Sequence, residues 1–284
     1  MKVGLGATIF RLAALGSFIG LCPFGCAATS GGRGTGAAGL GALRYVPADA
    51  IGVGEVDPKV LDHPLVAALL ANPRVDLGGI SVADLKKRVG TKPVTIFFLS
   101  GGGAGLVMQP GDGVKLPTTG PGNWEIAKEK GFLVAGSAGV TLRAMAASTR
   151  KERSPLIDAL REHADKSVRF VFKGWNDIGK SIGGMIPLPR EVTDAVQAIR
   201  ALVVTAALGS ELIVEVVAKA DPASARRLAE YIQGMLQVVK LGFMLAPSDR
   251  PEVKLAKPFV EGATVSSDGD SVVLRARIPS AARP

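Results

Sequence analysis

The sequence predicts an α+β protein made of two related modules of antiparallel strand pairs, each with an amphipathic helix packed on one sheet face. Three observations predict this class. Residues 202–219 alternate apolar and polar side chains around Gly209-Ser210, residues 223–241 repeat apolar side chains at helical spacing, and residues 259–278 form a second alternating pair around Asp268-Gly269. Strand pair, long helix and strand pair together describe a sheet with a helix across one face.

The first segment has the composition of a secretion signal. Lys2 and Arg11 make it basic, residues 12–21 supply a short apolar core, and small residues follow at 25–28. Glycines and a proline interrupt that core, which is too short to span a bilayer comfortably. We therefore expect residues 1–26 to be a signal peptide and the remainder to be exported.

Gly25-Cys26 resembles the lipobox of bacterial lipoproteins, in which a cysteine after a small residue is lipidated. Pro23-Phe24 departs from that pattern, which has an aliphatic and a small residue at these places. The alternative is ordinary cleavage after Ala27 or Ala28. The Gly- and Ala-rich residues 27–42 are predicted to form a flexible tether.

Both cysteines, Cys22 and Cys26, lie in this first segment, so no disulfide, cysteine metal site or thiol nucleophile is expected in the mature domain. The chain has a net charge of +9, and removal of Lys2 and Arg11 leaves +7. A basic exported domain favours anionic surfaces such as membranes or cell-wall polymers, and nucleic acid is not expected. The basic residues are dispersed apart from two short runs, so a solvated basic face is the simpler interpretation.

In the first half, residues 50–56 are predicted to form a strand. Asp57-Pro58 then opens a helical stretch, because Asp caps helix N-termini and Pro fits the first position. His63-Pro64 restarts this stretch and Pro73 stops it. Further strands are predicted at 94–99, 103–109 and 132–136, and a helix at 140–147.

In the second half, Ser154-Pro155 is predicted to cap a helix whose sequence, Pro155-Leu-Ile-Asp-Ala-Leu160, is similar to Pro64-Leu-Val-Ala-Ala-Leu69. A strand follows at 168–172 and a helix at 191–199. The hairpin strands are 202–208 and 212–219, with one face formed by Leu212, Val214, Val216 and Ala218.

The long helix at 223–241 is expected to start at Asp221-Pro222 and to end at Gly242. Its apolar face is predicted to comprise Leu228, Ile232, Met235 and Val239. The last hairpin is predicted at 259–265 and 271–278. These repeated patterns divide the chain into a first α+β module at 43–150 and a second at 151–280.

Residues 174–181, Gly-Trp-Asn-Asp-Ile-Gly-Lys-Ser, match the P-loop pattern after a predicted strand. Nucleotide binding would use Lys180 and Ser181 and requires a helix to begin there. The next residues include two glycines and two prolines, which do not sustain that helix. We interpret the motif as a loop and expect no cofactor.

Ala135-Gly-Ser137-Ala-Gly139 is a variant of the nucleophile elbow of α/β-hydrolases, placed between a strand and a helix. That fold requires an acid and then a histidine well downstream of the serine. The two histidines are His63 and His163, and His163 follows Ser137 by only 26 residues. Ser137 is therefore interpreted as a turn residue.

The other polar residues predict neither a catalytic nor a metal site. Two isolated histidines without a third ligand do not make a zinc site, and Asp268 and Asp270 belong to a turn. Trp124 and Trp175 lie in loops, where an exposed tryptophan can mark a contact surface. Lipidation of Cys26 is the one modification that the sequence suggests.

The segment Val46-Pro-Ala-Asp-Ala50, followed by a strand and Asp57-Pro58, resembles the start of the mature domain in a group of uncharacterised exported bacterial proteins. In these proteins a strand ending in Gly-Ser, like Val134-Ala-Gly-Ser137, leads into a helix. The resemblance spans at most residues 43–279. It implies a repeated strand-helix architecture at the cell envelope and carries over no activity, cofactor or catalytic residue.

These features lead us to expect a non-enzymatic exported or envelope-anchored binding or scaffold protein, located in the periplasm, on a membrane or outside the cell. Its expected partner is an envelope protein, polymer or lipid, with membrane association only through an acyl chain on Cys26. The first alternative is a carrier of a lipid or small apolar ligand in a groove between helix and sheet. The second is a serine hydrolase that uses Ser137.

Overall fold

The computed structural model describes residues 41–64, 66, 87, 89–111, 124–174, 190–245 and 251–279. These residues form helices and antiparallel strand pairs, which confirms the α+β class. They divide into two compact units, one ending at Val171 and the other beginning at Phe172, whereas the sequence analysis places the module boundary at 150/151. The predicted signal and almost all of the tether lie outside the described residues.

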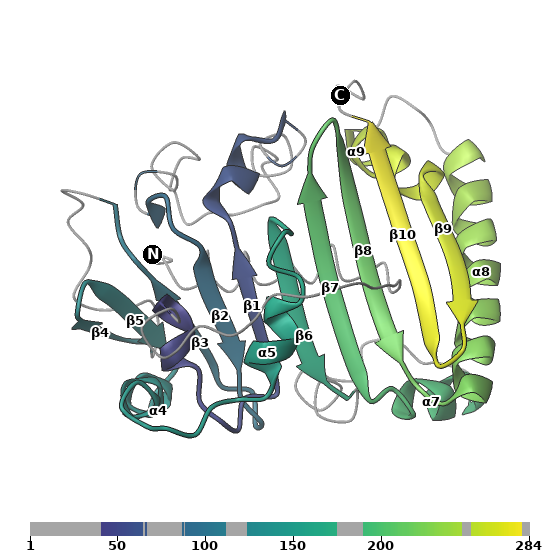
Figure 1. The fold of residues 1–284 in the computed structure, drawn as a ribbon. Coiled ribbons are helices and arrows are strands. Elements are labelled where there is room, and N and C mark those ends of the chain that lie inside the picture. The colour runs from purple at the N-terminus through teal and green to yellow at the C-terminus, as the bar shows by residue number, and fades with distance from the viewer. Residues whose placement is uncertain are drawn as a thin grey trace. The chain divides into compact units, whose positions relative to one another are not determined.

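The first unit contains a sheet with the strand order β4-β5-β3-β2-β1 and with β6 beside β1 (Figure 1). Its strands are β1 (Gly52–Val56), β2 (Val94–Phe98), β3 (Ala104–Met108), β4 (Glu125–Glu129), β5 (Phe132–Gly136) and β6 (Val168–Lys173). Five of them were predicted. The edge strand β4 was missed because its sequence, EIAKE, is charged and half exposed, which is unusual for a strand.

The helices of the first unit are η2 (Gly41–Tyr45), η3 (Pro58–Asp62), α4 (Val140–Ala147) and α5 (Leu156–Arg161). Helix α4 packs against β3, β4 and β5, and α5 packs against β1. The cap predicted at Asp57 is confirmed, because its Oδ1 accepts a hydrogen bond from Lys59 N (2.9 Å). At α5 the N-cap residue is Pro155, and Ser154 before it accepts a hydrogen bond from Leu156 N at its Oγ (3.4 Å). The stretch predicted to restart at Pro64 lies mostly outside the described residues.

Two glycines in this sheet make room for aromatic rings on neighbouring strands. A Cβ at Gly54 would lie 1.9 Å from the Phe170 ring, and a Cβ at Gly105 would lie 2.2 Å from the Phe97 ring. Glycine weakens a strand because it has no side chain to pack. Here the ring of the adjacent strand fills that space, as in the aromatic rescue of strand glycines.

A buried ion pair joins β1 and β6 of the first unit. Arg169 Nε donates to Glu55 Oε2 (3.1 Å), and the Thr95 hydroxyl on β2 donates to Glu55 Oε1 (3.3 Å). Only 10% of the Glu55 side chain and 15% of the Arg169 side chain are exposed. The Glu55 carboxylate is therefore held between two strands by partners that satisfy both of its oxygens.

The second unit contains an antiparallel sheet with the order β7-β8-β10-β9. Its elements are α7 (Arg190–Gln197), β7 (Ala201–Leu208), β8 (Glu211–Lys219), α8 (Pro222–Leu245), α9 (Pro251–Glu261), β9 (Ala263–Asp268) and β10 (Ser271–Pro279). Figure 1 shows α8 running alongside β9 and β10, with which it is in contact. The predicted hairpin at 202–219 is confirmed.

The core of the second unit lies between α8 and one face of this sheet. The predicted face of β8 is buried, with Val216 2% and Ala218 0% exposed. From the helix, Ala225, Leu228, Ala229 and Ile232 pack into a cluster with side chains of β9 and β10. Amphipathic periodicity in the first half of α8 thus correctly identifies the side that faces the sheet.

Two predicted boundaries in this unit are wrong. Helix α8 does not end at Gly242 but continues to Leu245, and the backbone at Gly242 is not in the left-handed region. Glycine permits a left-handed helix end but does not impose one, and the Phe243-Met-Leu245 segment continues the helix. The strand predicted from residue 259 starts at Ala263, because α9 extends to Glu261 with Pro258 inside it.

The second unit repeats the polar row of the first. Arg275 Nε on β10 donates to Glu215 Oε2 on β8 (2.7 Å), and Thr205 on β7 donates its hydroxyl to the Glu215 carbonyl (3.4 Å). Each unit therefore has threonine, glutamate and arginine on three adjacent strands. In the second unit the arginine is 40% exposed, so this ion pair is better solvated than the pair in the first.

We predict that Arg169→Met lowers the free energy of unfolding by about 3–5 kcal/mol, because Glu55 would stay buried without its cation. The matched variant Arg275→Met should cost less, because Arg275 is 40% exposed and its removal lets water reach Glu215, of which 16% is exposed. Urea unfolding followed by circular dichroism measures both. Equal losses for the two variants would contradict the role given to the buried pair.

Candidate interaction surface

Helix α8 carries six of the seven large apolar side chains that stand exposed among the described residues. Their exposed fractions range from 37% for Val239 to 79% for Leu245. We call this set the α8 apolar surface; it comprises Met235, Val238, Val239, Leu241, Met244 and Leu245. Contiguous exposed apolar surface on a folded domain marks a place where another molecule binds.

Four members of the α8 apolar surface point away from the sheet, whereas Met235 and Val239 lie within about 60° of the buried Ile232 around the helix axis. Ile232 is buried, and nine residues at about 100° each put Leu241 about half a turn away from it. The 24 residues of α8 extend about 36 Å, whereas the six residues of β9 extend about 20 Å. The helix is therefore longer than the strand beside it, and its last turns extend past that strand.

The prediction that Met235 and Val239 belong to the buried face is only partly right. They are 47% and 37% exposed, whereas Leu228 and Ile232 are buried as predicted. From residue 235 onward, apolar residues occupy nearly every position, so the period of 3.6 no longer distinguishes one face from another. That loss of periodicity was itself the signal that sequence reasoning missed.

Charge is almost absent from this part of α8. Between Glu230 and Leu245 the sequence has a single charged residue, Lys240, whose ammonium donates to the carbonyl oxygen of Ala263 (2.9 Å). No carboxylate therefore belongs to the α8 apolar surface. A partner that covers the α8 apolar surface therefore does not bury an unpaired carboxylate of this helix.

The N-terminus of α8 is capped as predicted. Asp221 Oδ1 accepts a hydrogen bond from Ser224 N (3.0 Å), and this backbone hydrogen bond is the main reason that the pKa of Asp221 lies below its ordinary value. The carboxylate also lies at the positive end of the helix dipole. The cap fixes the start of the helix that carries the candidate surface.

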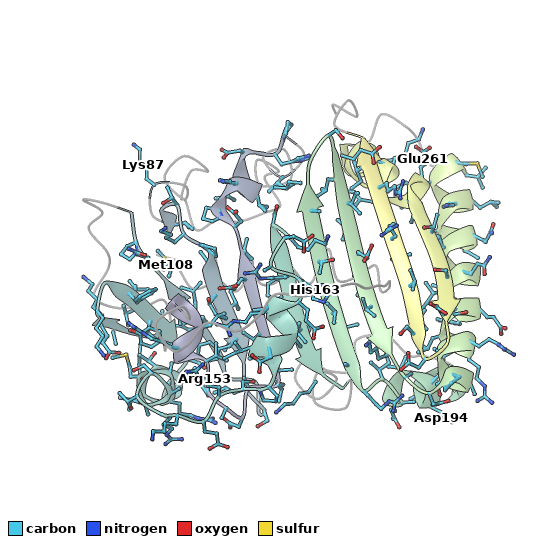
Figure 2. The ribbon with its side chains drawn as sticks, in the orientation of Figure 1. Lys87, Met108, Arg153, His163, Asp194 and Glu261 are labelled. Atoms are coloured by element: carbon cyan, nitrogen blue, oxygen red, sulfur yellow. The ribbon has the colours of Figure 1, made fainter. Side chains whose placement is uncertain are left out.

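Ser137 lies in the turn between β5 and α4, where its backbone N donates to the Ala104 carbonyl (3.2 Å). Among the described residues, Lys130 is the one non-glycine residue with a positive φ, so Ser137 does not have a strained left-handed backbone. Strand β5 is antiparallel to both neighbours, unlike the strands of α/β folds. His163 comes just after the C-terminal end of α5 (Figure 2), whereas Ser137 comes just before the N-terminal end of α4.

The remaining predicted residues are distributed over separate elements. His63 caps the end of η3, Trp124 is half-buried before β4, and Asp268 and Asp270 flank Gly269 in the β9–β10 turn. Residues 175–181, with Trp175 and most of the P-loop match, lie outside the described residues, as does Cys26. Within the described ranges, histidine, cysteine and carboxylate side chains form no group of three that could hold a metal ion.

No helix among the described residues is both long enough and apolar enough to cross a bilayer.

No protein-family model and no curated protein matches the chain. Among solved structures, crystal form III of TP0453 is 12% identical, with a TM-score of 0.46, and the match covers 85% of this chain and 94% of that one. Crystal forms IV and I have TM-scores of 0.45 and 0.43 at 12% and 10% identity, over 84% of this chain and 92% and 93% of theirs.

We predict that Asp221→Ala lowers the thermal unfolding temperature at neutral pH more than Asp221→Asn does, because asparagine keeps the accepting oxygen. The folded-state pKa of Asp221 is depressed, so its charge stabilises the fold above the unfolded pKa, and this stabilisation is lost as pH falls through the folded pKa. The difference between wild type and Asp221→Asn should therefore disappear in acid. A difference that stays constant with pH would argue against the charged cap.

Proposed function

We propose that the chain is a non-enzymatic, exported and envelope-anchored binding protein that lies against a lipid bilayer through the α8 apolar surface. The observation that carries this proposal is the concentration of exposed apolar side chains on one helix. An acyl chain on Cys26 and the tether at 27–42 would hold the domain near the membrane, at a root-mean-square distance of about 20–24 Å. Helix α8 would add a second membrane contact to the one that the acyl chain on Cys26 provides.

The energetics favour coverage of this surface. Burying a large apolar side chain contributes about 1.5–3 kcal/mol, so covering six partly exposed ones would contribute roughly 5–10 kcal/mol before the cost of association. That cost is about 4–15 kcal/mol for a free partner. A tether to the same membrane reduces it, because the second contact forms at a high effective concentration.

The distribution of the apolar residues favours lipid over a single partner helix. At about 100° per residue, the six side chains occupy more than half of the helix circumference, whereas a partner helix covers a stripe about 100° wide. A bilayer interface surrounds a helix from several sides at once. The net charge of +7 expected for the mature chain suits anionic headgroups.

We also propose that the two units are related modules, each an antiparallel sheet with a helix on one face. The row of threonine, glutamate and arginine that recurs in both sheets supports this relation. The glutamate strand precedes the threonine strand in the first unit and follows it in the second. If the two modules are related, the glutamate and threonine strands have therefore exchanged their order along the chain.

We predict that Leu241→Gln with Leu245→Gln lowers the partition of the protein onto vesicles of phosphatidylcholine and phosphatidylglycerol by about tenfold or more, because two anchoring side chains become polar. Vesicle flotation of the full chain carrying Cys26→Ser measures this without an acyl anchor. The control is Gln233→Ala with Gln237→Ala, which changes two exposed polar positions of the same helix without removing an apolar side chain and should not weaken binding.

Three outcomes separate the alternatives. Unchanged flotation of the leucine variant would rule out α8 as the membrane contact. If the wild-type chain does not bind vesicles but self-associates in light scattering, and the leucine variant does not, the α8 apolar surface binds a second copy of the chain instead of lipid. Co-purification of a stoichiometric lipid visible by mass spectrometry would favour the carrier.

A further inference from the structure

A groove in the first unit lies between the Pro47–Asp49 turn and the outward side of α4. It has a volume of about 540 Å³, within the range of ligand sites in proteins. Ala146 and Ala147 form its floor on the helix side, and the turn that forms the opposite wall is closed by a hydrogen bond from Ala50 N to the Pro47 carbonyl (3.1 Å). The small floor residues leave room for a peptide backbone to approach the helix.

Some of the charged side chains along the groove have an ion-pair partner and others do not. At one end Arg143 is paired with Asp49. At the other end Arg150 is exposed, and no carboxylate of the described residues pairs with it. The neighbouring Lys151 and Arg153 likewise pair with no carboxylate of the described residues; Figure 2 labels Arg153, between α4 and α5. Of residues 150–153, Arg150 and Glu152 line the groove, and Lys151 and Arg153 beside them bring the net charge of this exposed run to two positive charges.

An exposed leucine stands at the opposite end from this cationic cluster. Leu142 lines the groove and is 71% exposed, the one large apolar side chain so exposed among the described residues of the first unit. Leu142 and Arg150 are eight residues apart, about 12 Å along the helix and the turn that follows it. An extended peptide covers that distance in about four residues.

We propose that this groove binds an extended acidic segment of a partner protein. A carboxylate of the segment pairs with Arg150 and its cationic neighbours, the backbone lies over Ala146 and Ala147, and an apolar side chain about four residues away contacts Leu142. Arginine suits this role because its planar guanidinium binds a carboxylate through two parallel hydrogen bonds. The proposal is independent of the α8 apolar surface, which lies in the other unit.

Selection of a random peptide library displayed on phage against the purified full chain tests the proposal. The expected result is enrichment of peptides with two or more Asp or Glu residues and an apolar residue about four positions away. Synthetic copies should bind at least tenfold more weakly to Arg150→Glu, which reverses the charge, and to Ala146→Trp, which fills the groove. Circular dichroism checks that both variants are folded.

The matched control is Lys92→Glu, a charge reversal at an exposed lysine near the opposite end of the β1–β2 pair from the groove, and it should bind like the wild type. Enrichment of neutral or basic peptides would overturn the proposal. So would acidic peptides that bind equally to all three variants. Loss of binding to phosphatidylglycerol vesicles in Arg150→Glu, without any acidic peptide selected, would instead assign the groove to a lipid headgroup.

Discussion

The packing of α8 on a shorter sheet edge is the constraint on which the rest of the account depends. Burial of Leu228 and Ile232 fixes one side of the helix against β9 and β10, and the cap at Asp221 fixes its start. Because the helix is about 36 Å long, its final turns then extend past a strand of about 20 Å. The exposure of Met235 and Val239, which lie toward the same side as Ile232, follows from that geometry, whereas Leu241 and Leu245 are exposed because they face away from the sheet.

The two sheets supply the rigidity that such a surface needs. In the first unit, Glu55 is held between β1 and β6 by Arg169, and in the second, Glu215 is held to β10 by Arg275. Ion pairs of this kind fix the register of neighbouring strands, because a shift of one residue would separate the partners and move every side chain to the other face. A helix packed on a sheet with a fixed register presents its outer side in one orientation.

Most of the architecture could be predicted from the sequence, because alternation and caps are local signals. Residues 140–147 and the hairpin at 202–219 follow from period and turn chemistry alone. The end of α8, helix α9 and strand β4 could not, since each contradicts a local rule: Gly242 inside a helix, Pro258 inside a helix, and a charged strand. The α8 apolar surface was missed for a different reason. How much of the length of an apolar helix is covered depends on how far the strands beside it extend, and no local pattern contains that information.

The central claim is that the outer side of α8 enters a lipid interface, and fluorescence from a single site on that side tests it most directly. Because both cysteines lie in the predicted signal, a chain with Cys22 and Cys26 replaced by serine can be labelled at one new thiol with an environment-sensitive dye. The account predicts that a label at Leu241→Cys shifts its emission to the blue when vesicles containing phosphatidylglycerol are added. A label at Glu230→Cys, which lies outside the α8 apolar surface and about 16 Å closer to the N-terminus of the same helix, should shift much less. Identical emission at both sites, with and without vesicles, would contradict the account.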